Sequence, residues 1–277
     1  MTRTIAWLFA ALLATPAQAH DTWFERLPGD GLALGTGNQF PQQESGLDPR
    51  FIATSGCRAA RLATTLAVTQ VSERALELRA SPGASTCWLQ SAPFTVTLAP
   101  DKIELYLREV NPGPELRAAW ASLHSRGLPW RERYVKHARI ELADTPSAAP
   151  APLGLDLAIE HEGPIEPGQT FAVRVRRDGV PLAGQAVELR SEDSPLGLWR
   201  RSDAQGRLTF PALLHGRWLL RAIELRLSAT EPDRFDSRFA TTAFQIGMNF
   251  SSNARSANQA AASAAITSEP PSSTTRR

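Results

Sequence analysis

The stretch that decides the fold is Phe171-Ala172-Val173-Arg174-Val175-Arg176-Arg177-Asp178-Gly179. Its large apolar side chains recur at every second residue, between alanine and arginine, so one face of a strand is buried and the other is wet. The Asp-Gly pair that follows is typical of a two-residue hairpin turn. The stretch therefore predicts a β-hairpin, and with it an antiparallel sheet.

The same pattern extends from this hairpin through residues 153–248. Further short runs of alternating or apolar residues are separated by turn residues; they lie at 187–189, 208–210, 218–222 and 235–246. A tight turn is also expected at 203–206. Short strands with turns at this spacing are typical of a seven-strand, immunoglobulin-like antiparallel sandwich.

Residues 20–143 also consist mainly of predicted strands. Runs rich in Thr, Val and Leu, bounded by Gly, Pro and Ser, lie at 22–24, 62–71, 75–79, 94–98, 102–107 and 131–142. Leu116, Ala119, Trp120 and Leu123 recur at helical spacing instead and predict one amphipathic helix within 113–126. The fold class is therefore mainly all-β, with two antiparallel β-sandwich domains and one short helix in the first.

Two segments of biased composition complete the domain plan. Residues 144–152 are rich in proline and alanine, which is typical of a stiff linker between two domains. Residues 249–277 are mostly Ser, Ala, Thr and Pro, and they carry too little apolar surface to fold. We expect this tail to be disordered.

The first 19 residues have the composition of a secretory signal peptide. Arg3 supplies positive charge, Ile5–Ala14 forms a short apolar run, and Ala17-Gln18-Ala19 is a small-x-small cleavage pattern. The apolar run is too short for a bilayer span of about 20 residues, although an uncleaved anchor is the alternative. We expect export to the periplasm, cleavage after Ala19 and no membrane span in the mature chain.

The chain contains two cysteines, Cys57 and Cys87. In an oxidising periplasm two cysteines in one small domain most simply form one disulfide. A metal site with two cysteine ligands is the alternative, but the pair has no CxxC spacing. The sequence predicts a Cys57–Cys87 disulfide.

Cleavage after Ala19 would make His20 the first residue of the mature chain. Its free α-amine, with an ordinary pKa of about 7.7–8.0, and its imidazole could then close one chelate ring on a divalent metal. Imidazole suits zinc, copper and nickel alike. His20 is the first candidate metal ligand.

A metal site needs three or four ligands, so His20 needs partners. His137 is the second candidate, although the arginines at 131, 133 and 139 share its predicted strand face and would repel a cation. His161-Glu162 begins like a zinc-protease motif, but the Gly-Pro pair that follows forbids the required helix. The chain carries no nucleophile elbow or phosphate-binding loop, and we expect a protein that is not an enzyme.

Five motifs in a fixed order carry a resemblance to a known family. They are His20–Phe24, Gly35–Pro41, Trp130–Lys136, Ser202–Arg207 and Gly216–Ala222. The chain resembles a bacterial domain-of-unknown-function family of periplasmic proteins often labelled as nickel or cobalt uptake components. The resemblance implies a second domain similar to the carboxypeptidase-regulatory or transthyretin-like sandwich, and a mature chain that begins with histidine.

The resemblance and the residues together lead to one expected function. We expect a non-enzymatic periplasmic protein that binds or escorts nickel or cobalt, with copper as the alternative metal, beside an inner-membrane metal permease. Many members of that family carry a second histidine just before the Phe-Pro pair, where this chain has Asn38 and Gln39 before Phe40-Pro41. The alternatives are a structural or adhesion-type module without metal and a copper enzyme with a histidine brace.

The formal net charge is +2, and loss of Arg3 with the signal peptide lowers it to +1. A chain this close to neutral is not expected to bind nucleic acid.

Overall fold

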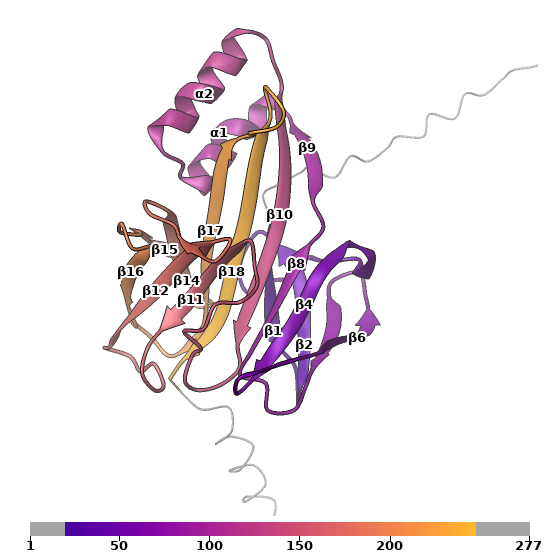
Figure 1. The fold of residues 1–277 in the computed structure, drawn as a ribbon, viewed down its shortest axis with the longest axis vertical. Helices are drawn as coiled ribbons and strands as arrows, with labels where there is room; N and C mark the ends of the chain where they lie inside the picture. Colours follow the sequence, from indigo (N-terminus) through magenta and orange to yellow (C-terminus); the bar gives the residue numbers. More distant parts are fainter. Residues whose placement is uncertain (1–19, 248–277) are drawn as a thin grey trace, which may run out of the picture.

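The computed structural model describes residues 20–247. The predicted signal peptide, its cleavage site and the predicted disordered tail lie outside these residues. Within them the chain is mainly β-structure, as predicted, and the strands form three sheets (Figure 1).

The largest sheet has nine strands and runs through the whole molecule. Its strands, in spatial order, are β15 (Ser194–Arg201), β14 (Ala186–Ser191), β17 (Gly216–Leu227), β18 (Phe235–Ile246), β10 (Trp130–Glu141), β8 (Thr86–Ser91), β4 (Ile52–Ala59) and β5 (Leu62–Thr64), with β9 (Phe94–Leu98) paired to β10. β10 is antiparallel to β8 and β9 but parallel to β18, the one parallel pair among the described strands. Strands from both predicted domains therefore share one sheet.

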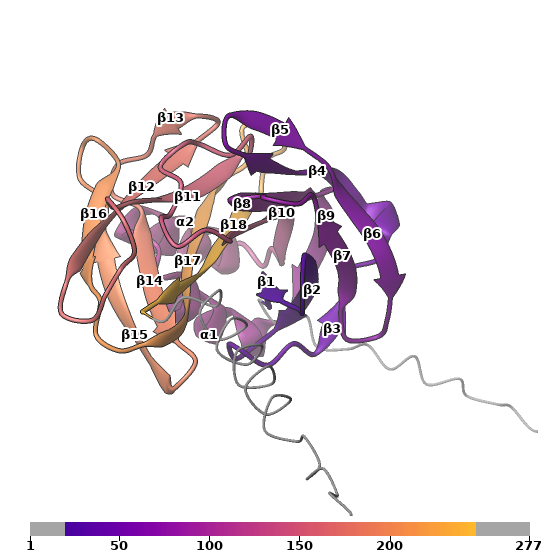
Figure 2. The same ribbon diagram turned by 90° about the horizontal axis from the view of Figure 1, so that it is seen from below.

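Two smaller sheets pack on opposite faces of this large sheet. One contains β1 (Asp21–Arg26), β2 (Gly31–Gly37), β7 (Leu76–Ala80) and β6 (Leu66–Val71), with β3 (Ser45–Gly46) beside β2. The other contains β11 (Leu155–Glu160), β12 (Thr170–Arg177) and β13 (Val180–Pro181), with β16 (Arg207–Pro211) beside β12. Figure 2 shows the two small sheets on either side of β18 and β10.

Neighbouring residues of β17 show why the two faces are both apolar. Leu219 belongs to the core under the five-stranded sheet, whereas Leu220 belongs to the core under the four-stranded sheet. Successive side chains of a strand point to opposite faces, so β17 and its neighbour β18 supply both cores. The core under the four-stranded sheet is built entirely of residues beyond 153. The core under the five-stranded sheet consists mainly of residues from the first segment but also includes Leu219 and Ala243.

The hairpin predicted at 171–179 is present. β12 and β13 pair across a turn in which Asp178 and Gly179 have φ values of 50° and 80°. Two positive φ values are what a type I′ turn requires, and the Asp-Gly pair accepts them readily. The segment predicted as one strand at 62–71 is instead two strands, and the chain passes between sheets at Thr65.

The prediction of one helix was wrong, because the first segment contains two. The predicted helix is α2 (Pro114–Ser125), and the run 102–107, predicted as a strand, lies within α1 (Pro100–Val110). Alternation of apolar residues in this run favours a strand, but the buried side chains of α1 recur at helical spacing: Ile103, Tyr106, Leu107 and Val110. Pro100, at the first helical position, is a helix-start signal.

The helices cover the upper end of the same sheet face as the five-stranded sheet (Figure 1). Trp130 and Phe235 stack there with ring centroids 4.0 Å apart, and Trp120 meets Trp130 edge-on. Glu132 lies beneath them, buried, and accepts hydrogen bonds from Tyr106 Oη at 2.7 Å and Trp130 Nε1 at 2.8 Å. These donors satisfy a carboxyl group that would otherwise be costly to bury.

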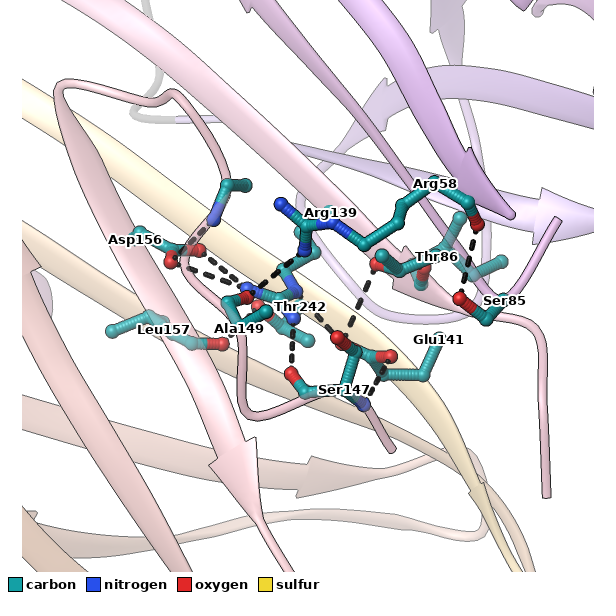
Figure 3. A network of polar contacts seen from close by, with 12 residues as sticks. Arg58, Ser85, Thr86, Arg139, Glu141, Ser147, Ala149, Asp156, Leu157 and Thr242 are labelled. Atoms are coloured by element: carbon teal, nitrogen blue, oxygen red, sulfur yellow. Dashed lines mark hydrogen bonds and ion pairs between the residues drawn. The ribbon is translucent and has the colours of Figure 1, made fainter. Parts of the chain in front are cut away.

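A buried charge cluster holds the predicted linker against the sheets. Arg139 is fully buried, and its Nε lies 2.7 Å from Glu141 Oε1 while one terminal nitrogen lies 3.0 Å from Asp156 Oδ1 (Figure 3). The linker joins this cluster through the Ser147 amide, which donates to Glu141, and the Ala151 amide, which donates to Asp156. The segment 144–152 is therefore attached at its middle and near its C-terminal end.

Cys57 and Cys87 form the predicted disulfide, which links β4 to β8. A structural disulfide is compatible with an extracytoplasmic location. α1 and α2 contain 11 and 12 residues, and neither they nor any other helix within 20–247 meets the length and hydropathy needed to cross a bilayer.

Candidate functional site

His20 lies directly before β1, at the boundary between the five-stranded sheet and the large sheet. Its Nε2 lies 3.8 Å from Glu44 Oε2, with the two side chains 27% and 48% exposed. The imidazole therefore faces a carboxylate at the surface, and solvent reaches both groups. A cation placed between them could be bound by a nitrogen and an oxygen at once.

The loop that carries Glu44 folds back over β2 because β2 contains glycines. A Cβ atom at Gly37 would lie 2.3 Å from the Gln42 carbonyl oxygen, and one at Gly35 would lie 2.4 Å from the Gln43 side chain. The loop is then fixed by the Glu44 amide, which donates to the Thr36 carbonyl at 2.8 Å. The glycines of the Gly35–Pro41 motif thus position Glu44 beside the start of β1.

Asp21 fixes the other side of the site. Its carboxylate is buried, and Oδ2 lies 2.8 Å from Arg221 Nε on β17. Glu188 on β14 lies 3.0 Å from a terminal nitrogen of the same guanidinium, and the Glu109 carbonyl at the end of α1 accepts from it at 3.2 Å. His20 is therefore adjacent to a residue whose ion-pair partner, Arg221, is itself in contact with β14 and α1.

The surroundings of His20, burial above all, favour the neutral form of its imidazole. Burial lowers the pKa of the His20 imidazole first, the positive charge of Lys136 lowers it further, and the negative charges of Glu44 and Asp21 raise it. Burial also lowers the pKa of the Lys136 ammonium to about 8, against the opposing charge of Asp21. A neutral imidazole is the form that binds a metal ion.

His137 lies in a different environment. It is buried on β10, and its Nδ1 lies 3.0 Å from the Phe239 carbonyl oxygen. A carbonyl can only accept, so Nδ1 carries the proton and Nε2 is left as the acceptor. A Cβ atom at Gly154 would lie 2.9 Å from this Nε2, so backbone packs closely against it. Burial lowers the pKa of His137 to about 4.

The structure does not bring His20 and His137 together. Lys136, whose charge acts on His20, is the neighbour of His137 in β10, and neighbours in a strand point to opposite faces. Within residues 20–247 there is no group of three or more His, Cys, Asp or Glu side chains placed to hold a metal ion. His137 as a ligand stays a prediction without support from this geometry. Arg139, predicted to make the His137 face cationic, is neutralised by Glu141 and Asp156.

Two residues of the site were not predicted. Glu44 follows two glutamines in a loop, and only its proximity to the Gly-Thr-Gly run could have drawn attention to it. Lys136 lies within the Trp130–Lys136 motif, and strand alternation already separates it from His137. No known family profile matches the chain, and no curated protein has a similar sequence.

Proposed function

We propose that this protein is an exported, non-enzymatic binder of a divalent transition metal, with nickel or cobalt as its cargo and copper as the alternative. The observation that carries the proposal is the solvent-accessible pair of His20 and Glu44, 3.8 Å apart at the start of the first strand. The metal is cargo here, bound and released in support of uptake.

The proposed ligand set has three members. Cleavage after Ala19 supplies the α-amine of His20, the imidazole is the second nitrogen donor, and the Glu44 carboxylate adds an oxygen. Imidazole and amine nitrogens suit nickel, cobalt and copper, and the Irving–Williams order makes copper the tightest of the three in a simple titration. Exposure of Glu44 leaves one side of the ion open, which suits exchange with a partner, for which we propose an inner-membrane metal permease.

The surrounding charges both assist and oppose this site. Lys136 helps to deprotonate the imidazole, but its ammonium also repels a metal ion. Asp21 cannot serve as a free ligand because Arg221 already binds its carboxylate. Weak to moderate affinity follows from this balance, which fits a protein that passes its ion onward.

Replacement of His20 tests the proposal. We expect His20→Ala to abolish the heat of nickel binding measured by titration calorimetry on exported protein. His124→Ala, an exposed histidine on α2, is the matched control and should bind as the wild type does. Equal binding by the wild type and His20→Ala would contradict the proposal.

A second candidate function is a structural or adhesion-type interaction module without metal. β6 favours it, since this strand ends the five-stranded sheet, carries no charged residue from Leu66 to Val71, and exposes Val68 and Val71. An uncharged edge strand can pair with a strand of another chain. Val68→Lys should then abolish partner binding without changing any response to nickel.

A further inference from the structure

A partly open cavity of about 350 Å³ lies at the far end of β1 from His20. It is bounded by the last residues of β1 and β10, the first residues of β17 and the last residues of β18. Its volume falls at the lower end of the range for small-molecule sites. The cavity therefore has the size for a ligand of one or two rings.

The walls of the cavity include a group of aromatic side chains. Phe24, Phe40, Trp218 and Phe244 line it, together with the small side chain of Ala243. All five residues are buried in the fold and belong to its two cores. Walls fixed in this way are preformed, so a ligand would gain apolar contact without ordering the protein.

The charged residues at the cavity already have partners. Arg217 Nε lies 2.7 Å from Glu192 Oε2, and a terminal nitrogen of Arg26 donates to the Glu141 carbonyl oxygen at 3.1 Å. Because these charged groups already have partners, the cavity does not require a charged ligand.

Gln245 is different, because its Oε1 is buried and has no hydrogen-bond partner within the described part of the chain. It lines the same cavity and shares a strand face with Ala243, two residues before it. A buried amide oxygen without a partner is costly and rare in folded proteins. A ligand that donates one hydrogen bond would satisfy it.

We propose that this cavity binds a small, uncharged aromatic molecule that carries one hydrogen-bond donor, with its rings between Phe24, Trp218 and Phe244 and its donor on Gln245 Oε1. This site is separate from the proposed metal site. It gives the protein a second ligand, of a different chemical class.

Indole and N-methylindole form a matched pair of probes, since they differ in the one N–H donor. Calorimetric titration of the full-length protein should show indole binding one to one, about fivefold more tightly than N-methylindole, as expected for one neutral hydrogen bond. Gln245→Leu should bind both probes equally, whereas Gln205→Leu, in an exposed turn, should keep the preference.

Filling the cavity provides an independent test. Ala243→Leu should weaken indole binding at least tenfold, with folding verified by its thermal transition. If this variant does not fold, the Gln245→Leu comparison decides alone. The proposal is overturned if indole shows no binding at millimolar concentration, if a folded Ala243→Leu binds as the wild type does, or if Gln245→Leu retains the preference for indole.

Discussion

The Oδ2 atom of Asp21 lies 2.8 Å from Nε of Arg221, 200 residues further along the chain. This ion pair joins the first residue of β1 to the middle of β17, and both side chains are buried. If cleavage follows Ala19, as we predict, the ion pair holds the start of the mature chain against the nine-stranded sheet, to which both halves of the protein contribute. The ion pair thereby fixes the start of β1, the strand that directly follows His20.

Asp21→Asn should destabilise the fold by about 3 kcal/mol, since removal of one partner leaves a buried charge incompletely paired. Arg221 keeps its contact with Glu188, which limits the loss. Asp48→Asn removes an exposed ion pair with Arg50 and should cost less than about 1 kcal/mol. Urea unfolding of the two variants measures the difference, and equal costs would show that the Asp21 pair does not anchor β1.

Glu44→Gln should weaken nickel binding about tenfold or more, because even residues that only orient a ligand change metal affinity by about 10–100-fold. The stability should not change, since the Glu44 side chain is half exposed. Glu104→Gln, on the exposed side of α1, is the control. Unchanged nickel affinity in Glu44→Gln would remove the carboxylate from the ligand set.

Lys136→Met should strengthen nickel binding by about three- to tenfold, because it removes a positive charge that acts on His20 through a medium of reduced polarity. Lys102→Met removes an exposed lysine and should leave the affinity unchanged. Weaker binding by Lys136→Met would contradict the repulsion and assign the amine a direct part in holding the ion. Calorimetry at constant ionic strength makes the comparison.

The buried His137 should make the fold sensitive to acid. Its pKa is about 4 in the folded protein and about 6.5 when unfolded, so the unfolded chain takes up a proton first as the pH falls. The stability is therefore fully present above pH 6.5, and about 2–3 kcal/mol of it is lost between pH 6.5 and 4.

His137→Gln should show a smaller loss over this interval, and His124→Gln, exposed on α2, should behave as the wild type does. Urea unfolding at a series of pH values provides the measurement. An identical pH profile for His137→Gln would show that His137 does not contribute.

Arg139→Met should destabilise the protein by about 3–5 kcal/mol, because Glu141 and Asp156 would be left as buried carboxylates without their cation. Replacement of all three residues by apolar residues of similar size should recover most of this loss. If the triple variant is as unstable as Arg139→Met, the cluster acts through its hydrogen bonds to the linker rather than through charge.

Local pattern was sufficient to predict much of the fold. Alternating residues identify β12, the Asp-Gly pair identifies its turn, and the run Phe94–Leu98 coincides with β9. α1 was missed because Ile103, Leu105 and Leu107 alternate as in a strand, although Leu105 is exposed. Whether a side chain is buried depends on which other elements pack against its own element. The local sequence pattern carries no information about those neighbours.

The site was harder to predict for a physical reason. His20 follows from the cleavage pattern, and Cys57 pairs with Cys87 because no other cysteine exists. Glu44 reaches His20 only through the path of a loop over two glycines, and Arg221 reaches Asp21 only through the shared nine-stranded sheet. The parallel pairing of β10 with β18 joins residues about 100 positions apart and has no signature in either strand alone.

Nickel titration of protein that begins at His20, beside the same protein with one additional methionine before His20, tests the central claim most directly. The N-terminal residue of each sample is verified by mass spectrometry. The account predicts that the added residue weakens nickel binding at least tenfold, because it converts the α-amine to an amide, while the melting temperature without metal is unchanged. Equal nickel affinity of the two proteins, or no binding by either, would contradict it.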